Sequence, residues 1–164
     1  MSAKAIVYTS NTGYTERYAK MLGEKTGLPV YALEEVGKKL EKGTPIIYLG
    51  WLMAGSVKGY NKAAKKYEVC AVCGVGLSDT GAMQEDVRKA HNLPADMPVF
   101  TVQGGMDLDK LRGINKMMIQ MLTKSMTSKK DRTEGEDRMV YLLQNGGDYV
   151  SEEHLTVVLE WYNK

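Results

Sequence analysis

Short apolar runs alternate with amphipathic runs along the first two thirds of the chain. Five apolar runs predict β-strands, at residues 5–8, 29–33, 45–50, 68–75 and 98–103. Helical spacing of apolar positions between them predicts helices at residues 16–25, 34–40, 56–67 and 80–91. Val- and Ile-rich strands that are each followed by a helix are typical of a parallel sheet covered on both faces. We therefore expect an α/β fold whose strand-to-helix loops gather at one edge of the sheet.

The pattern changes after the fifth predicted strand. An apolar stripe at helical spacing predicts one helix over residues 108–126, and an almost wholly polar run, 129–138, follows it. A last helix is predicted to begin after Ser151, whose hydroxyl suits an N-cap, and to end at about Trp161. A connection as long as 106–150 is unusual in a compact domain, so we interpret it as an insertion in a single domain, residues 1–164.

Composition and charge exclude several classes of protein. The hydrophobic fraction of 43% is ordinary for a globular chain, and the net charge of +2 is too mild to argue for a nucleic-acid-binding protein, which usually has a clear basic stripe. No apolar run approaches the roughly 20 residues that cross a bilayer. The N-terminal residues do not resemble a secretory signal, so we expect a cytoplasmic protein.

The loop after the first predicted strand is rich in hydrogen-bond donors. It reads Thr9-Ser10-Asn11-Thr12-Gly13-Tyr14-Thr15 and leads directly into a helix. Hydroxyls, an amide and the free N–H groups of a helix start can bind a phosphate, and Gly13 lets the backbone approach it. The alternative is a turn that only caps the helix, although one residue suffices for that. The loop lacks GxxxxGK[ST] and GxGxxG, which argues against nucleotide hydrolysis and a dinucleotide site.

A buried strand, this loop and a helix resemble the signature of the flavodoxin family, and the resemblance covers residues 1–105. It implies a flavodoxin-like three-layer sandwich with a parallel sheet. The strands would follow the order 2-1-3-4-5, which is the order in flavodoxin itself. It also implies FMN, held by its ribityl phosphate at the loop. The insertion, with Met117-Met118 and basic residues nearby, is similar to that of the flavodoxin-domain group that includes quinone-linked protoporphyrinogen IX dehydrogenase.

The same resemblance implies that two further segments face the flavin ring. One is Trp51-Leu52-Met53-Ala54-Gly55 and the other is Cys73-Gly74-Val75-Gly76. Trp51 either stacks on the ring or belongs to the core, and Gly55 would let a peptide turn toward the flavin N5. The second segment lacks an aromatic residue, so one face of the flavin would be open to a small organic substrate or a quinone.

The cysteines and histidines predict neither a catalytic nor a metal site. Cys70 and Cys73 have CxxC spacing, but residues three apart in a strand point to opposite faces, so we expect two structural thiols. His91 and His154 have no triad signature nearby and are expected to be solvated. We nominate no catalytic side chain, because a flavin supplies its own redox chemistry.

These features favour an FMN-dependent oxidoreductase that moves electrons between a small organic substrate and a quinone or another carrier, such as a redox partner protein. The alternative is an electron-transfer flavodoxin without its own substrate, but classical members are strongly acidic and this chain is slightly basic. A signalling receiver domain would need acidic residues where Thr9-Ser10-Asn11 stand. The stripe at 108–126 is expected to pack on the sheet edge, and its flanking cations make peripheral membrane contact the alternative.

Overall fold

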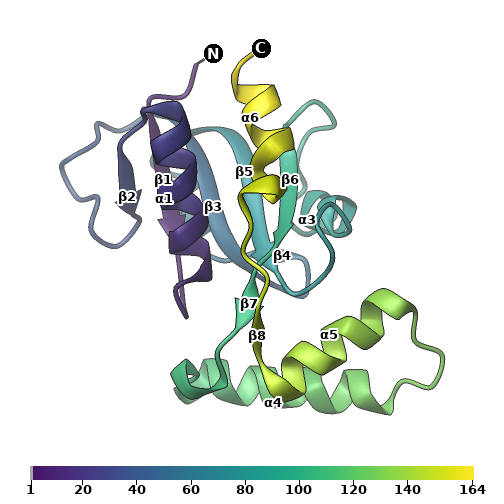
Figure 1. Ribbon diagram of the computed structural model, residues 1–164. Helices are drawn as coiled ribbons and strands as arrows, with labels where there is room; N and C mark the ends of the chain where they lie inside the picture. Colours follow the sequence, from purple (N-terminus) through teal and green to yellow (C-terminus); the bar gives the residue numbers. More distant parts are fainter. Residues whose placement is uncertain (1) are drawn as a thin grey trace.

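Five parallel strands form the main sheet of the computed structural model, which describes residues 2–164 (Figure 1). Their bounds are β1 (Ala5–Thr9), β2 (Val30–Ala32), β3 (Pro45–Met53), β5 (Glu68–Gly76) and β6 (Val99–Gln103). The order across the sheet is β2-β1-β3-β5-β6, which confirms the expected order 2-1-3-4-5. All neighbouring pairs in this order are parallel, so their carboxyl ends share one edge.

Helices cover both faces of the sheet and give three layers. Helix α1 (Tyr14–Thr26) and helix α6 (Thr156–Tyr162), with the 3₁₀ turn η2 (Glu152–Leu155) before it, pack on one face. Helices α2 (Tyr60–Ala64) and α3 (Gln84–Ala90) pack on the other face. The side chains of each strand alternate between the two cores, as Ile6 faces α1 and Val7 faces α2. The expected α/β fold is therefore confirmed.

Three of the predicted helices are shorter than expected or absent. Residues 34–40 form turns, and the helices predicted at 56–67 and 80–91 shrink to α2 and α3. Each of these segments contains a glycine at positive φ: Gly37 (46°), Gly59 (80°) and Gly81 (85°). A left-handed residue cannot continue a right-handed helix, so Gly37 interrupts its segment, Gly59 is the N-cap of α2, and Gly81 lies in the turn before α3.

Strand β3 also continues three residues beyond the predicted end at Gly50. Residues Ser56–Val57, predicted as helix, form β4 and pair antiparallel with the end of β3. Ala54 and Gly55 connect the two strands with φ values of 50° and 79°. Positive φ at both central residues is typical of a type I′ hairpin, whose twist matches that of the flanking strands.

The insertion forms an arm that extends beyond the sheet (Figure 1). A two-stranded ribbon of β7 (Gly105–Met106) and β8 (Gly147–Asp148) connects it to the sheet. Between the ribbon strands lie η1 (Leu108–Lys110), α4 (Gly113–Ser128) and α5 (Glu134–Asn145), where the sequence pattern predicted one helix. The polar run 129–138 contains the start of α5, where Thr133 is the N-cap and forms a capping box with Glu136. Within residues 2–164, no helix has the length and apolar character needed to cross a membrane.

Candidate functional site

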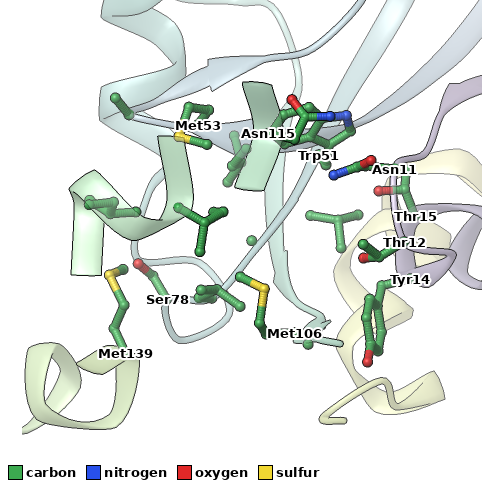
Figure 2. A pocket seen from close by; sticks show the side chains of 18 of the residues that line it. Asn11, Thr12, Tyr14, Thr15, Trp51, Met53, Ser78, Met106, Asn115 and Met139 are labelled. Atoms are coloured by element: carbon green, nitrogen blue, oxygen red, sulfur yellow. The ribbon is translucent and has the colours of Figure 1, made fainter. Parts of the chain in front are cut away.

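A cavity of about 350 Å³ lies between the carboxyl edge of the sheet and the helical arm (Figure 2). Four segments form its walls: the loop that begins α1, the β3–β4 hairpin, the loop after β5, and the arm. This volume is within the range of about 300–1,000 Å³ that is typical of small-molecule sites. The donor-rich loop forms one side of the cavity, and Met139 of α5 lies on the opposite side (Figure 2).

Five of the seven residues predicted to bind phosphate line the cavity: Ser10, Asn11, Thr12, Tyr14 and Thr15. The other two do not line it. Thr9 points to the α2 side of the sheet, where its hydroxyl lies 2.7 Å from the Tyr48 hydroxyl. Gly13 shapes the loop, since its φ of 100° turns the chain into α1 and its N–H donates to Ser10 Oγ at 3.1 Å.

The start of α1 offers donors to an anion. Its N-cap residue, Gly13, has no side chain that could accept from the first-turn N–H groups. These N–H groups and the helix dipole therefore favour a negative charge beside Ser10 and Thr12. The nearest cation on this helix, Arg17, forms an ion pair with Asp148 at 2.6 Å. Dipoles and hydroxyls, rather than a free cation, would have to hold a phosphate here.

The second predicted segment, Trp51–Gly55, lines the cavity along its whole length. It belongs to the end of β3 and the type I′ turn, so the hairpin fixes its backbone. Leu52 turns toward the α2 side of the sheet and packs over Gly74 and Gly76 of the neighbouring strand. Trp51 is half-buried, and the Lys58 ammonium lies 5.4 Å from its ring centroid.

The third predicted segment is part of β5 rather than a loop. Val75 and Gly76 line the cavity, and the loop itself begins at Leu77. A Cβ atom on Gly74 would lie 2.7 Å from the Leu52 side chain, so this glycine leaves space for Leu52. Cys73 does not line the cavity either, because it is fully buried in the core beneath α1.

The expectation that the two cysteines point to opposite faces is wrong. The register pairs Ile46 with Val69 and Ile47 with Ala71, so β5 has one extra residue at Cys70. This bulge places Cys70 and Cys73 on the same face of the sheet, toward α1 and α6. Both are free thiols, and burial raises the pKa of Cys73 to about 12.

The expectation that the histidines are solvated is also wrong. His91 is half-buried, and its Nε2 accepts a hydrogen bond from the Val57 N–H at 2.8 Å. Burial lowers the pKa of His91 accordingly. His154 Nδ1 lies 2.7 Å from the hydroxyl of Tyr18, which is fully buried. Each histidine therefore supports local structure, His91 behind the hairpin and His154 in the turn before the last helix, where it contacts α1.

Sequence reasoning missed the residues that close the cavity from the other side. They come from the loop after β5, the ribbon and the arm: Leu77, Ser78, Met83, Gly105, Met106, Leu111, Asn115, Ile119, Leu122, Met126, Glu136 and Met139. One face of α4 packs over the cavity with Met106 and Leu143, instead of on the sheet edge as expected. The helical spacing of Asn115, Ile119, Leu122 and Met126 is the signal in the sequence that marks this face.

Comparison with known proteins identifies the family. The family described as "Flavodoxin domain" matches residues 5–134. One solved structure, described as the crystal structure of a hypothetical protein, is 18% identical, covers 99% of this chain and 73% of that chain, and has a TM-score of 0.41. No curated protein matches the sequence significantly. Since the family match spans well over half of its length, the chain belongs to the flavodoxin-domain family.

Proposed function

We propose that this chain binds FMN in the cavity and acts as an oxidoreductase between a small organic substrate and a quinone or another electron carrier. The observation that carries the proposal is the composition of the cavity at the sheet edge. A helix start rich in donors lies on one side, and mainly apolar side chains form the remaining walls. Phosphate suits the first part, and a planar ring system suits the second.

The residues on the polar side fit a phosphate monoester. Ser10, Asn11 and Thr12 would donate from their side chains, and the first turn of α1 would donate from its backbone. Thr15, which is 2% exposed, lies at the base of this group. The nearby carboxylate of Glu16 forms an ion pair with Lys20 at 2.8 Å, and this positive partner limits its repulsion of a phosphate.

The remaining walls fit an isoalloxazine ring. Trp51 and the hairpin turn would lie along one side of it, and Gly76 with Leu77 and Ser78 along another. A bound flavin would supply one- and two-electron transfer, so the protein needs no further redox group. Ile119 and Met126 of the arm would keep water from the ring and leave an apolar surface for a substrate.

Two features favour a substrate-converting enzyme over a simple electron carrier. The arm adds apolar walls to the cavity beyond those of the sheet loops, which suits a planar apolar molecule such as a quinone. The net charge of +2 lacks the strong acidity that helps carrier flavodoxins dock on basic partners. The insertion also resembles that of the quinone-linked protoporphyrinogen IX dehydrogenase group, so porphyrinogens belong among the substrates to test.

FMN binding is tested by calorimetric titration of the apoprotein with FMN and with riboflavin. Thr12→Val removes a hydroxyl that lines the cavity and should weaken FMN about ten-fold, with riboflavin nearly unchanged. Thr9→Val is the matched control, because its hydroxyl faces Tyr48 and not the cavity. It should leave the ratio of the two affinities unchanged. Equal losses for FMN and riboflavin with Thr12→Val would mean that the loop does not hold the phosphate.

The enzyme and the carrier are separated by a redox titration of the FMN-loaded protein. A hydroquinone couple well below that of free flavin would support the carrier. A couple near that of free flavin, with rapid anaerobic oxidation of the reduced protein by a naphthoquinone, would support the enzyme. Ile119→Ala should then slow the quinone reaction more than it weakens FMN, because Ile119 belongs to the arm side of the cavity.

A further inference from the structure

Helix α4 has a second apolar face, which points away from the cavity. Ile114, Met117 and Met121 are 70%, 54% and 67% exposed, whereas Ile119 on the opposite side is 9% exposed. Spacings of three and four residues place the three exposed side chains in one row along the helix. An exposed row of large apolar side chains is unusual for the surface of a monomer and marks an interaction surface.

The same helix and its flanks are strongly cationic. Residues 110–130 include six lysines and arginines and no aspartate or glutamate. Lys116 and Lys124 are exposed on α4 and, within the described residues, take part in no ion pair. With about 3.6 residues per turn, Lys124 borders the exposed apolar row beside Met117 and Met121, and Lys116 lies about a quarter-turn further round the helix. This face therefore offers both apolar contact and unpaired positive charge.

We propose that this face of α4 binds the surface of a membrane that contains anionic lipids. An amphipathic helix with large apolar side chains flanked by lysines lies in the interface, where the apolar row reaches the acyl boundary and the ammonium groups meet lipid phosphates. The position of α4 at the outer end of the arm leaves this face clear of the sheet (Figure 1). The protein would be attached peripherally, in keeping with the lack of a membrane-spanning helix among residues 2–164.

The charge of the face argues against a second copy of this chain as its occupant. A symmetric dimer would bring the same row from both copies together and place two sets of lysines against each other. Like charges held together across an interface are costly. Anionic lipid instead provides the opposite charge and an apolar layer in one surface. The proposal does not depend on the proposed flavin, because none of Ile114, Met117 and Met121 lines the cavity.

The test is co-sedimentation of the full chain with vesicles of phosphatidylcholine, with and without phosphatidylglycerol. We expect binding to the anionic vesicles only, and weaker binding at high salt. The double variant Met117→Glu/Met121→Glu should lower the partition coefficient at least about ten-fold, since it removes apolar contact and adds repulsion. Lys116→Gln/Lys124→Gln should lower it roughly five-fold for each charge removed.

Matched controls change the same residue types elsewhere on the surface. Val157→Glu introduces a carboxylate at an exposed apolar residue of α6, and Lys38→Gln/Lys42→Gln removes two exposed lysines far along the chain from the arm. Both controls should bind vesicles as the wild type does. Circular dichroism of each α4 variant shows whether it still folds, and FMN titration shows whether its cavity is intact. A variant that passes both tests but binds vesicles weakly has lost only the membrane-binding face.

Three outcomes would overturn the proposal. The first is no sedimentation of the wild type with anionic vesicles, and the second is undiminished sedimentation of the α4 glutamate variant. The third is a dimer in sedimentation equilibrium that the glutamate variant dissociates, which would assign the face to a second copy. Failure of FMN binding with intact vesicle binding would instead count only against the proposed function.

Discussion

Removing the hydrogen-bond acceptor that His91 provides should destabilise the β3–β4 hairpin that lines the cavity. Its Nε2 accepts from the Val57 N–H at 2.8 Å, and its Nδ1 lies 3.3 Å from Asn61 Oδ1. The proton of neutral His91 is therefore on Nδ1, and a second proton would go to Nε2. Two N–H donors would then face each other behind β4, because Val57 is 1% exposed and its N–H has no other partner within the described residues.

The size of the effect follows from the contacts of the ring. Leaving the Val57 N–H without a partner costs about 1–3 kcal/mol, and the edge-to-face contact with Tyr60, 4.7 Å between centroids, contributes about 0.5–1.5 kcal/mol. His91 is only half-buried, so values in the lower half of each range apply. We expect His91→Leu to lower the free energy of unfolding by about 2 kcal/mol. That corresponds to a fall in Tm of roughly 4–8 °C for a chain of this length.

The pH dependence has a definite sign. Burial lowers the pKa of His91 below its ordinary value of 6.5, so the unfolded chain takes up a proton at a higher pH than the folded protein does. The stabilisation is complete above pH 6.5 and declines as the pH falls through the lower pKa of the folded protein. FMN affinity should decline over the same window, since the hairpin lines the cavity.

Thermal unfolding of wild type, His91→Leu and His91→Gln, measured from neutral pH to about pH 5, tests this reasoning. The glutamine variant keeps an acceptor, so it should lose only about 1 kcal/mol, mainly the contact with Tyr60. Its Tm should also vary less with pH than that of the wild type. If His91→Gln retains the full pH dependence, another group causes it and the assigned role of His91 is wrong.

Three further predictions concern other parts of the structure. Ala54→Gly should raise the free energy of unfolding by about 0.5–1 kcal/mol in chemical denaturation, because a φ of 50° strains alanine; an unchanged value would mean that the turn is not left-handed at this position. In the native protein a thiol reagent should modify Cys70 and leave Cys73 unmodified, because burial raises the pKa of Cys73 to about 12, and equal labelling would contradict its burial. Arg138→Gln breaks the ion pair that joins the arm to Asp79. It should change the free energy of unfolding by less than about 1 kcal/mol, but it should speed proteolysis within the arm. Unchanged proteolysis would mean that the apolar contacts alone hold the arm in place.

The sheet was predictable because its signals are local and repeated. The central strands β1, β3 and β5 are buried on both faces over most of their length, so each contains a continuous, mainly apolar run. The place of the donor-rich loop at the cavity was predictable for a similar reason, since its donors are contiguous and the helix follows at once. Five of its seven residues line the cavity without any contribution from distant parts of the chain.

The deviations from the prediction depend on pairing between segments, which periodicity does not encode. Residues 56–57 read as the start of a helix, but backbone pairing with the end of β3 makes them a strand. The bulge at Cys70 likewise depends on the register between β3 and β5, and it reverses which face the cysteine occupies. His91 gains its partner only because that new strand, β4, leaves the Val57 N–H pointing toward it.

The arm shows most clearly why a correct pattern can give an incomplete site. The apolar stripe read from residues 108–126 combines two rows of α4, one that covers the cavity through Ile119 and one that is exposed through Met121. A helix that packs on one surface only needs a single apolar face, so the second row requires its own explanation. Flavin binding would account for the first row alone. The cations beside the second row favour a partner that offers both negative charge and an apolar layer, as the proposed anionic membrane does. The cavity and the outer face of α4 therefore need separate tests.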